Sequence, residues 1–127
     1  MGTPVGDNAE HGTLPSIGSR TRILDAARIA ELGRQEIAPG ITSVQLWSEG
    51  RSYAGTMYLE PQATLSKHTH RRHAHHVWVV DGMVDALGRH LPRGSYAYVP
   101  PGQPHDMVAG PAGATILYLY LESDDHG

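Results

Sequence analysis

The sequence predicts a single all-β domain, built as a sandwich or a jelly-roll barrel. Its 127 residues are near the common size for one domain and too few for two hydrophobic cores. Glycine (15 residues) and proline (9 residues) are abundant without forming a repeat, which suits many short strands joined by tight turns. After residue 40, apolar and polar residues alternate with the two-residue period of β-strands.

The expected elements begin with a flexible arm and a short helix. Residues 1–20 carry Gly, Pro, Thr and Ser with scattered charges and no periodic apolar pattern, so we expect a flexible N-terminal arm followed by one domain over residues 21–127. Between Ile23 and Ile37 the apolar side chains recur at helical spacing, and Gly33 can end that helix. Little other helix is expected.

The rest of the chain is expected to form short strands. The segment 53–59 is a clear example, because Tyr53, Met57 and Leu59 share one face. Segments with Gly or Pro separate the strands, and Asp81-Gly82 is expected to form a tight turn. Strands are expected at residues 41–47, 53–59, 64–70, 75–80, 83–87, 94–99, 105–108 and 115–121. This many closely spaced strands favour a sandwich or a jelly-roll barrel.

Composition and charge argue against several classes of function. The formal net charge is −3, and Lys67 is the single lysine, so no basic stripe is present to bind nucleic acid or an anionic membrane. The absence of cysteine excludes disulfides and thiolate chemistry. No stretch approaches the ~20 apolar residues needed to span a bilayer, and no basic start precedes an apolar run. We therefore expect a soluble, cytoplasmic protein.

Histidine is the unusual feature of the composition, since five of the nine histidines lie between residues 68 and 76. Residues two apart in a strand share a face, so His68 and His70 point to the same side, about 7 Å apart along the chain. Either His75 or His76 must face the same way, and alternation leaves open which. His105 follows a rigid Pro- and Gly-rich turn. Such a group indicates a divalent metal site.

The spacing of these residues resembles the two signature motifs of the cupin superfamily. The first motif has His68, His70, position 75 and Gly82, and the second has Gly94, Pro100, Gly102 and His105. The resemblance covers about residues 40–121. It implies a cupin jelly-roll barrel (a double-stranded β-helix), here with a short N-terminal helix and the flexible N-terminal arm.

The resemblance also implies the metal ligands. Position 75 is ordinarily glutamate in the family and is histidine here, so the implied site has four histidines: His68, His70, His75 and His105. The family's glycine six residues before the first histidine is replaced by Gln62, and the asparagine often found after the last one is replaced by Ala109. Neither departure touches a ligand. Imidazole accepts zinc, iron, manganese, nickel or copper, so the ligand type alone does not choose among these metals. Zinc or iron is the first expectation.

The histidine at position 75 makes the chain similar to the four-histidine manganese or zinc cupins and to the cupin-type aromatic polyketide cyclases. Residues 75–82, 94–96 and 118–121 favour the cyclases. This resemblance implies a Lewis-acid catalyst of aldol cyclisation on a hydrophobic 1,3-dicarbonyl substrate. Four neutral ligands leave the ion its full +2 charge and, on a six-coordinate ion, two open positions for a bidentate substrate.

Two alternative functions remain. A dioxygenase that binds both a chelating substrate and O₂ at the metal needs three open positions, so it is the second interpretation. A non-catalytic metal- or ligand-sensing cupin is the third, because the chain offers no DNA-binding helix pair as an output element.

The proposed aldol chemistry also needs a general base. No carboxylate is spaced to act as the base, so metal-bound hydroxide is the first candidate for the proton acceptor and His73 and His76 are the reserve candidates. Arg71 and Arg72 are expected as solvated charges in a hairpin between the histidine strands.

We also expect a homodimer, because a short barrel leaves a strand edge and an apolar sheet face to cover.

Overall fold

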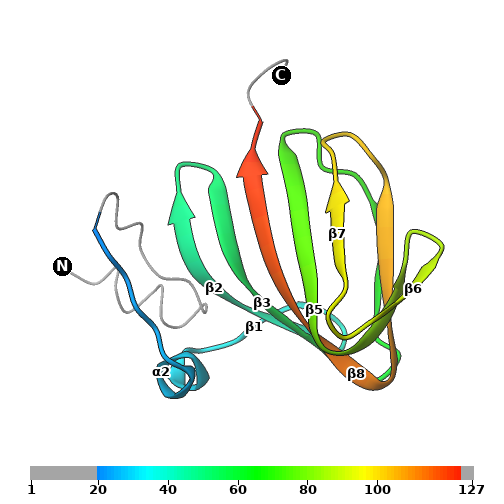
Figure 1. The fold of residues 1–127 in the computed structure, drawn as a ribbon, viewed down its shortest axis with the longest axis horizontal. Coiled ribbons are helices and arrows are strands. Elements are labelled where there is room, and N and C mark those ends of the chain that lie inside the picture. The colour runs from blue at the N-terminus through cyan, green and yellow to red at the C-terminus, as the bar shows by residue number, and fades with distance from the viewer. Residues whose placement is uncertain (1–19, 124–127) are drawn as a thin grey trace.

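The structure is a computed structural model that describes residues 20–123, so the expected N-terminal arm lies, apart from Arg20, outside the described residues. Within this range one short helix precedes eight strands (Figure 1). In chain order they are α2 (Ala26–Glu31), β1 (Gln35–Ala38), β2 (Ile41–Glu49), β3 (Ser52–Leu59), β4 (Thr64–His68), β5 (His73–Ala86), β6 (Arg89–Pro92), β7 (Tyr96–Val99) and β8 (His105–Glu122).

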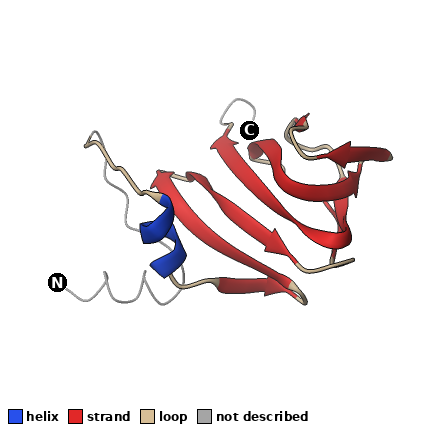
Figure 2. Cartoon of the chain, turned by 60° about the horizontal axis from the view of Figure 1, so that its bottom comes forward, coloured by secondary structure: helices blue, strands red, loops and turns tan. Residues whose placement is uncertain are grey.

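The strands pair antiparallel in one curled sheet with the order β1-β2-β3-β8-β5-β6, while β4 pairs with β8 and β7 pairs with β5. The long strand β8 makes this possible: its first residues pair with β4, and its last residues pair with both β3 and β5. The sheet therefore folds over on itself into an open barrel (Figures 1 and 2). This architecture confirms the predicted all-β jelly roll.

Strands β5 and β8 each replace two of the expected short strands. Asp81-Gly82 lies inside β5 and is not a tight turn. Strand β5 continues through both residues, which pair with Thr115 and Ala114 of β8. The register shifts on either side of them, and Gly82 has a φ of +72°. A bulge with a left-handed glycine bends a strand without reversing it, so β5 pairs with β7 before the bulge and with β6 after it.

The helix is shorter than its apolar pattern suggested. The Asp25 carboxylate accepts a hydrogen bond from the Arg28 backbone N–H at 2.8 Å and caps the first turn. The helix ends at Glu31, and Ile37 belongs to β1. Strands β1 and β6 were not predicted, because most of their residues are exposed and leave no alternating apolar signal.

The segment that carries Arg71 and Arg72 is not a hairpin. It joins β4 and β5, and in the described sheet β4 pairs with β8 and not with β5. Both arginines are exposed, as expected for solvated charges. This crossover matters for the site, because it brings the histidines of two strands that are not paired with each other to the same end of the barrel.

The hydrophobic core fills the interior of the barrel. Ile41, Val84 and Ile116 are fully buried there, and partly buried residues such as Val77 and Leu91 pack against them. His75 is a buried polar residue beside this apolar core, together with Ser43. Both of these polar residues belong to the candidate site.

Candidate metal centre and ligand pocket

The four motif histidines come together at one end of the barrel. His68 ends β4 and pairs with His105 at the start of β8, and one ring nitrogen each of His68, His70 and His105 lie within 4.8 Å of one another. The His75 ring centroid lies 4.2 Å from that of His70 and 5.0 Å from that of His105. The register of β5 thus turns His75, and not His76, toward the other three.

Backbone carbonyl groups hold two of the rings. The Nδ1 atom of His68 lies 2.6 Å from the Ser66 carbonyl oxygen, and that of His105 lies 3.2 Å from the Gln103 carbonyl oxygen. A carbonyl oxygen can only accept, so each Nδ1 carries the proton and each Nε2 keeps its lone pair. Histidines that bind metal ions commonly donate their second ring N–H in this way.

His75 lies beside this three-histidine group as a buried base without a partner. The residue is 2% exposed, and its Nε2 atom makes no hydrogen bond within the described residues. Burial and the neighbouring His70 lower the pKa of His75 to about 3, burial and His68 lower the pKa of His70 to about 4, and burial lowers the pKa of His105. Neutral imidazoles are the form that binds a metal ion, so the donor set fits a divalent cation.

The structure separates the two reserve base candidates. The Nε2 atom of His73 donates to the Arg51 carbonyl oxygen at 2.7 Å, and its ring centroid lies 6.5 Å from that of His75. His76 lies on the opposite face of β5, where its Nδ1 contacts the Tyr96 hydroxyl at 2.7 Å. Of the two, only His73 lies beside the histidine group.

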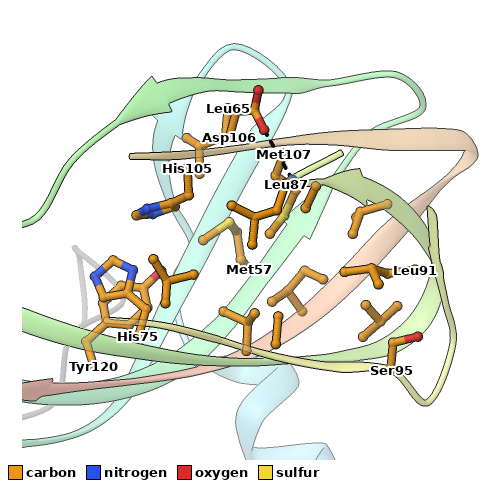
Figure 3. A pocket seen from close by; sticks show the side chains of 17 residues that line it. Met57, Leu65, His75, Leu87, Leu91, Ser95, His105, Asp106, Met107 and Tyr120 are labelled. Atoms are coloured by element: carbon orange, nitrogen blue, oxygen red, sulfur yellow. Dashed lines mark hydrogen bonds between the residues drawn. The ribbon is translucent and has the colours of Figure 1, made fainter. Parts of the chain in front are cut away.

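A narrow apolar cavity extends from His75, His105 and Tyr120 toward Leu91 and Ser95 (Figure 3). Its volume is about 30 Å³, far below the ~150 Å³ of an engineered cavity that holds benzene. This cavity is therefore part of the packed core and not a site for an organic ligand.

A larger space, the tyrosine pocket, opens beside the histidines. Its volume is about 280 Å³, near the lower end of the ~300–1,000 Å³ usual for small-molecule sites. The residues that line it are Ile37, Ser43, Tyr53, Met57, Leu65, His68, His70, Tyr118 and Tyr120. A ligand in this pocket contacts two of the motif histidines directly.

Three tyrosines form the wall of the pocket next to the histidines. Tyr120 stacks on His75 with a centroid distance of 3.6 Å, and Tyr118 stacks on Tyr120 at 4.7 Å. Tyr53 meets both tyrosines edge-on. Burial raises the pKa of all three hydroxyls, so at neutral pH they are hydrogen-bond donors and not bases.

The part of the chain that the structure describes holds no helix long and apolar enough to cross a membrane.

Comparison with solved structures identifies the fold. The structure of KdgF from Halomonas sp. matches with a TM-score of 0.70 at 23% identity, over 84% of this chain and 98% of that one. An RmlC-like cupin from Shewanella frigidimarina matches with a TM-score of 0.62 at 23% identity, over 87% and 91%. The Rhodobacter sphaeroides structure of SigE in complex with the anti-sigma ChrR matches with a TM-score of 0.60 at 16% identity, over 68% and 46%.

The sequence comparisons agree with this fold. No curated protein matches the sequence. The family model described as the ChrR cupin-like domain matches residues 25–123, a range that contains every strand and all four motif histidines. This chain therefore belongs to the ChrR cupin-like family within the cupin superfamily.

Proposed function

We propose that this chain is a metal-dependent enzyme that binds a divalent cation through His68, His70, His75 and His105 and acts on a 1,3-dicarbonyl substrate. The observation that carries this proposal is the buried, unpartnered Nε2 of His75 beside three further imidazoles. A buried polar atom without a partner is unfavourable, and a cation shared with the other histidines removes that cost. Bound there, a divalent cation supplies Lewis acidity, which makes the carbon between two carbonyls easier to deprotonate.

The tyrosine pocket is the proposed substrate site. His68 and His70 line this pocket, so the oxygens of a dicarbonyl bound there can lie next to the histidine centre. The stacked rings of Tyr118 and Tyr120 give the pocket a flat aromatic wall. Such a wall restricts a flexible chain to folded conformers in which an enolate carbon lies beside a second carbonyl.

His73 is the proposed proton acceptor. Its Nε2–H is held by the Arg51 carbonyl oxygen, so Nδ1 carries the lone pair. In the aldol cyclisation that we propose, His73 takes a proton from the carbon between two carbonyls, and that carbon forms a bond to the carbon of a further carbonyl. The oxygen of that carbonyl takes up a proton, and the resulting hydroxyl leaves as water.

The test is an ultraviolet titration of the zinc-loaded protein with acetylacetone. A red-shifted enolate absorbance that is absent from His105→Ala and from metal-free protein supports the proposal. Equal binding to metal-free protein contradicts it. Cleavage that requires O₂ would favour the alternative of a metal-dependent dioxygenase.

A second candidate is a non-catalytic metal- or ligand-sensing cupin, and the match to the ChrR cupin-like family favours it. The neighbour from Rhodobacter sphaeroides is a structure of SigE in complex with the anti-sigma ChrR. Under this alternative the zinc-loaded protein binds acetylacetone but does not cyclise a tetraketone, which, unlike acetylacetone, carries a further carbonyl for the enolate carbon to attack.

A further inference from the structure

Two hydroxyl groups meet in the wall of the tyrosine pocket. Ser43 lies on β2 and Tyr118 on β8, and the Ser43 Oγ and Tyr118 Oη atoms are 2.9 Å apart. The two residues are 9% and 4% exposed, and both line the pocket. Since β3 lies between β2 and β8 in the sheet, the Tyr118 side chain must cross β3 to reach Ser43.

Gly55 makes this contact possible. It is the residue of β3 directly opposite Tyr118, and a Cβ atom at this position would collide with the Val44 carbonyl oxygen and would lie 2.5 Å from the Tyr118 hydroxyl. Any other residue would therefore meet both the backbone of β2 and the phenol that reaches Ser43. Glycine inside a strand weakens the strand and often marks a place where another group approaches closely. Here the approaching group is a tyrosine hydroxyl directed at a serine.

The pair has more hydrogen-bonding capacity than it uses. Two hydroxyls carry two O–H donors, and their mutual bond consumes one of them. Within residues 20–123 neither side chain makes another hydrogen bond. One buried donor and several acceptor lone pairs therefore remain available to a molecule in the pocket, and leaving them unpaired is unfavourable.

We propose that the hydroxyl pair of Ser43 and Tyr118 recognises an oxygen at the end of the ligand remote from the histidines. This inference rests on the proposed function. The rings stack in the order His75, Tyr120, Tyr118, so the pair lies beyond Tyr120 as seen from the histidine centre. The ligand class is a planar 1,3-dicarbonyl with a third oxygen, a hydroxyl or a carbonyl, at its far end.

A pair of probes that differ in that oxygen tests the inference: 1-phenylbutane-1,3-dione and 1-(4-hydroxyphenyl)butane-1,3-dione. Zinc-loaded protein should bind the hydroxylated probe about tenfold more tightly, the effect of one added buried hydrogen bond. The double variant Ser43→Ala/Tyr118→Phe should lose this preference and still bind the phenyl probe, which also shows that the variant is folded. The control Ser48→Ala/Tyr58→Phe removes the same two hydroxyl types on β2 and β3 outside the pocket and should keep the preference.

The outcomes are distinct. If the parent protein binds both probes equally, or if the double variant retains the preference, the hydroxyl pair has only a structural role and the inference is wrong, although the proposed function stands. If neither probe binds to zinc-loaded protein, the proposed function fails and the inference falls with it.

Discussion

His68, His70 and His105 form a compact group. One ring nitrogen of each of these histidines lies within 4.8 Å of the other two. Removing one ligand leaves too few donors to compete with water for the ion. We expect His70→Ala and His105→Ala to lose bound metal while remaining folded. Elemental analysis of the purified variants, with circular dichroism as the check on folding, tests this. Undiminished metal in either variant would contradict the four-histidine site.

His75 holds the position that is ordinarily glutamate in the cupin motif. A carboxylate there would still bind a cation but would cancel one unit of its charge, so it would weaken Lewis-acid activation of a carbonyl. We expect His75→Glu to retain metal and to lower turnover of a 1,3-dicarbonyl substrate by about tenfold or more. Metal content and kcat are measured on the same preparation. Unchanged turnover would show that the charge of the ligand at position 75 is incidental.

At the scale of single residues, the sequence predicted that the four motif histidines lie together but not which tyrosines line the pocket. The choice between His75 and His76 depends on how β5 pairs with β7 and β8, which no local pattern specifies. Tyr118 and Tyr120 could not be assigned to the pocket from the sequence for a different reason. Their strand is apolar on both faces, with Leu117 and Leu121 on the outside, so alternation alone does not reveal which face lines the pocket.

At the scale of elements, β5 depends on the bulge at Gly82. This residue has a φ of +72°, and a Cβ there would collide with the Gly113 carbonyl oxygen. Gly88 is a matched control, since its φ is +75° but a Cβ would meet nothing within 4 Å. We expect Gly88→Ala to lower the free energy of unfolding by about 1 kcal/mol and Gly82→Ala to lower it by more than about 2 kcal/mol. Urea denaturation of both variants measures the difference, and equal losses would contradict a role for the Gly113 contact.

Strand prediction succeeded where one face is buried and failed where none is. The segments of β2, β3 and β7 carry enough alternation to be found, whereas β1 and β6 are short and mostly exposed. The merging of short strands into β5 and β8 could not be predicted either. Glycine and proline occur both at bulges and at turns, so their positions alone do not tell a bulge from a turn. Tertiary pairing of the strands decides between the two.

At the scale of the whole molecule, the histidine group makes the metal-free protein sensitive to acid. The pKa of His75 is about 3 and that of His70 about 4 in the folded state, against about 6.5 in an unfolded chain. Between these values the unfolded state binds protons that the folded state does not, so the free energy of unfolding falls as the pH falls from about 6.5 toward 3. Above about pH 6.5 this contribution is fully present. We expect His75→Gln to flatten the slope in urea titrations at several pH values, and an unchanged slope would contradict the burial of a neutral His75.

The outer face of β5, β7 and β8 bears on assembly. Tyr96 and Leu117 lie opposite Trp78 on the two neighbouring strands, and Val80 and Tyr98 are each 48% exposed. We propose that a second copy of the chain covers this face in a homodimer. Light scattering should give twice the monomer mass, and Val80→Lys/Leu117→Lys should give the monomer. Ile23→Lys, an exposed position near the helix, is the control. A monomer at micromolar concentration would contradict the proposal.

Strand β8 supplies His105 at its start and Tyr118 and Tyr120 near its end, so one continuous piece of backbone carries parts of both the histidine centre and the pocket. Inserting or deleting one residue in a strand turns every side chain beyond that point to the other face. A one-residue insertion or deletion inside β8 would thus point the tyrosines at solvent while leaving His105 in place. Over evolutionary time, new ligand preferences in this scaffold should arise by exchanging side chains along β8, and changes of length should be confined to the connections outside it.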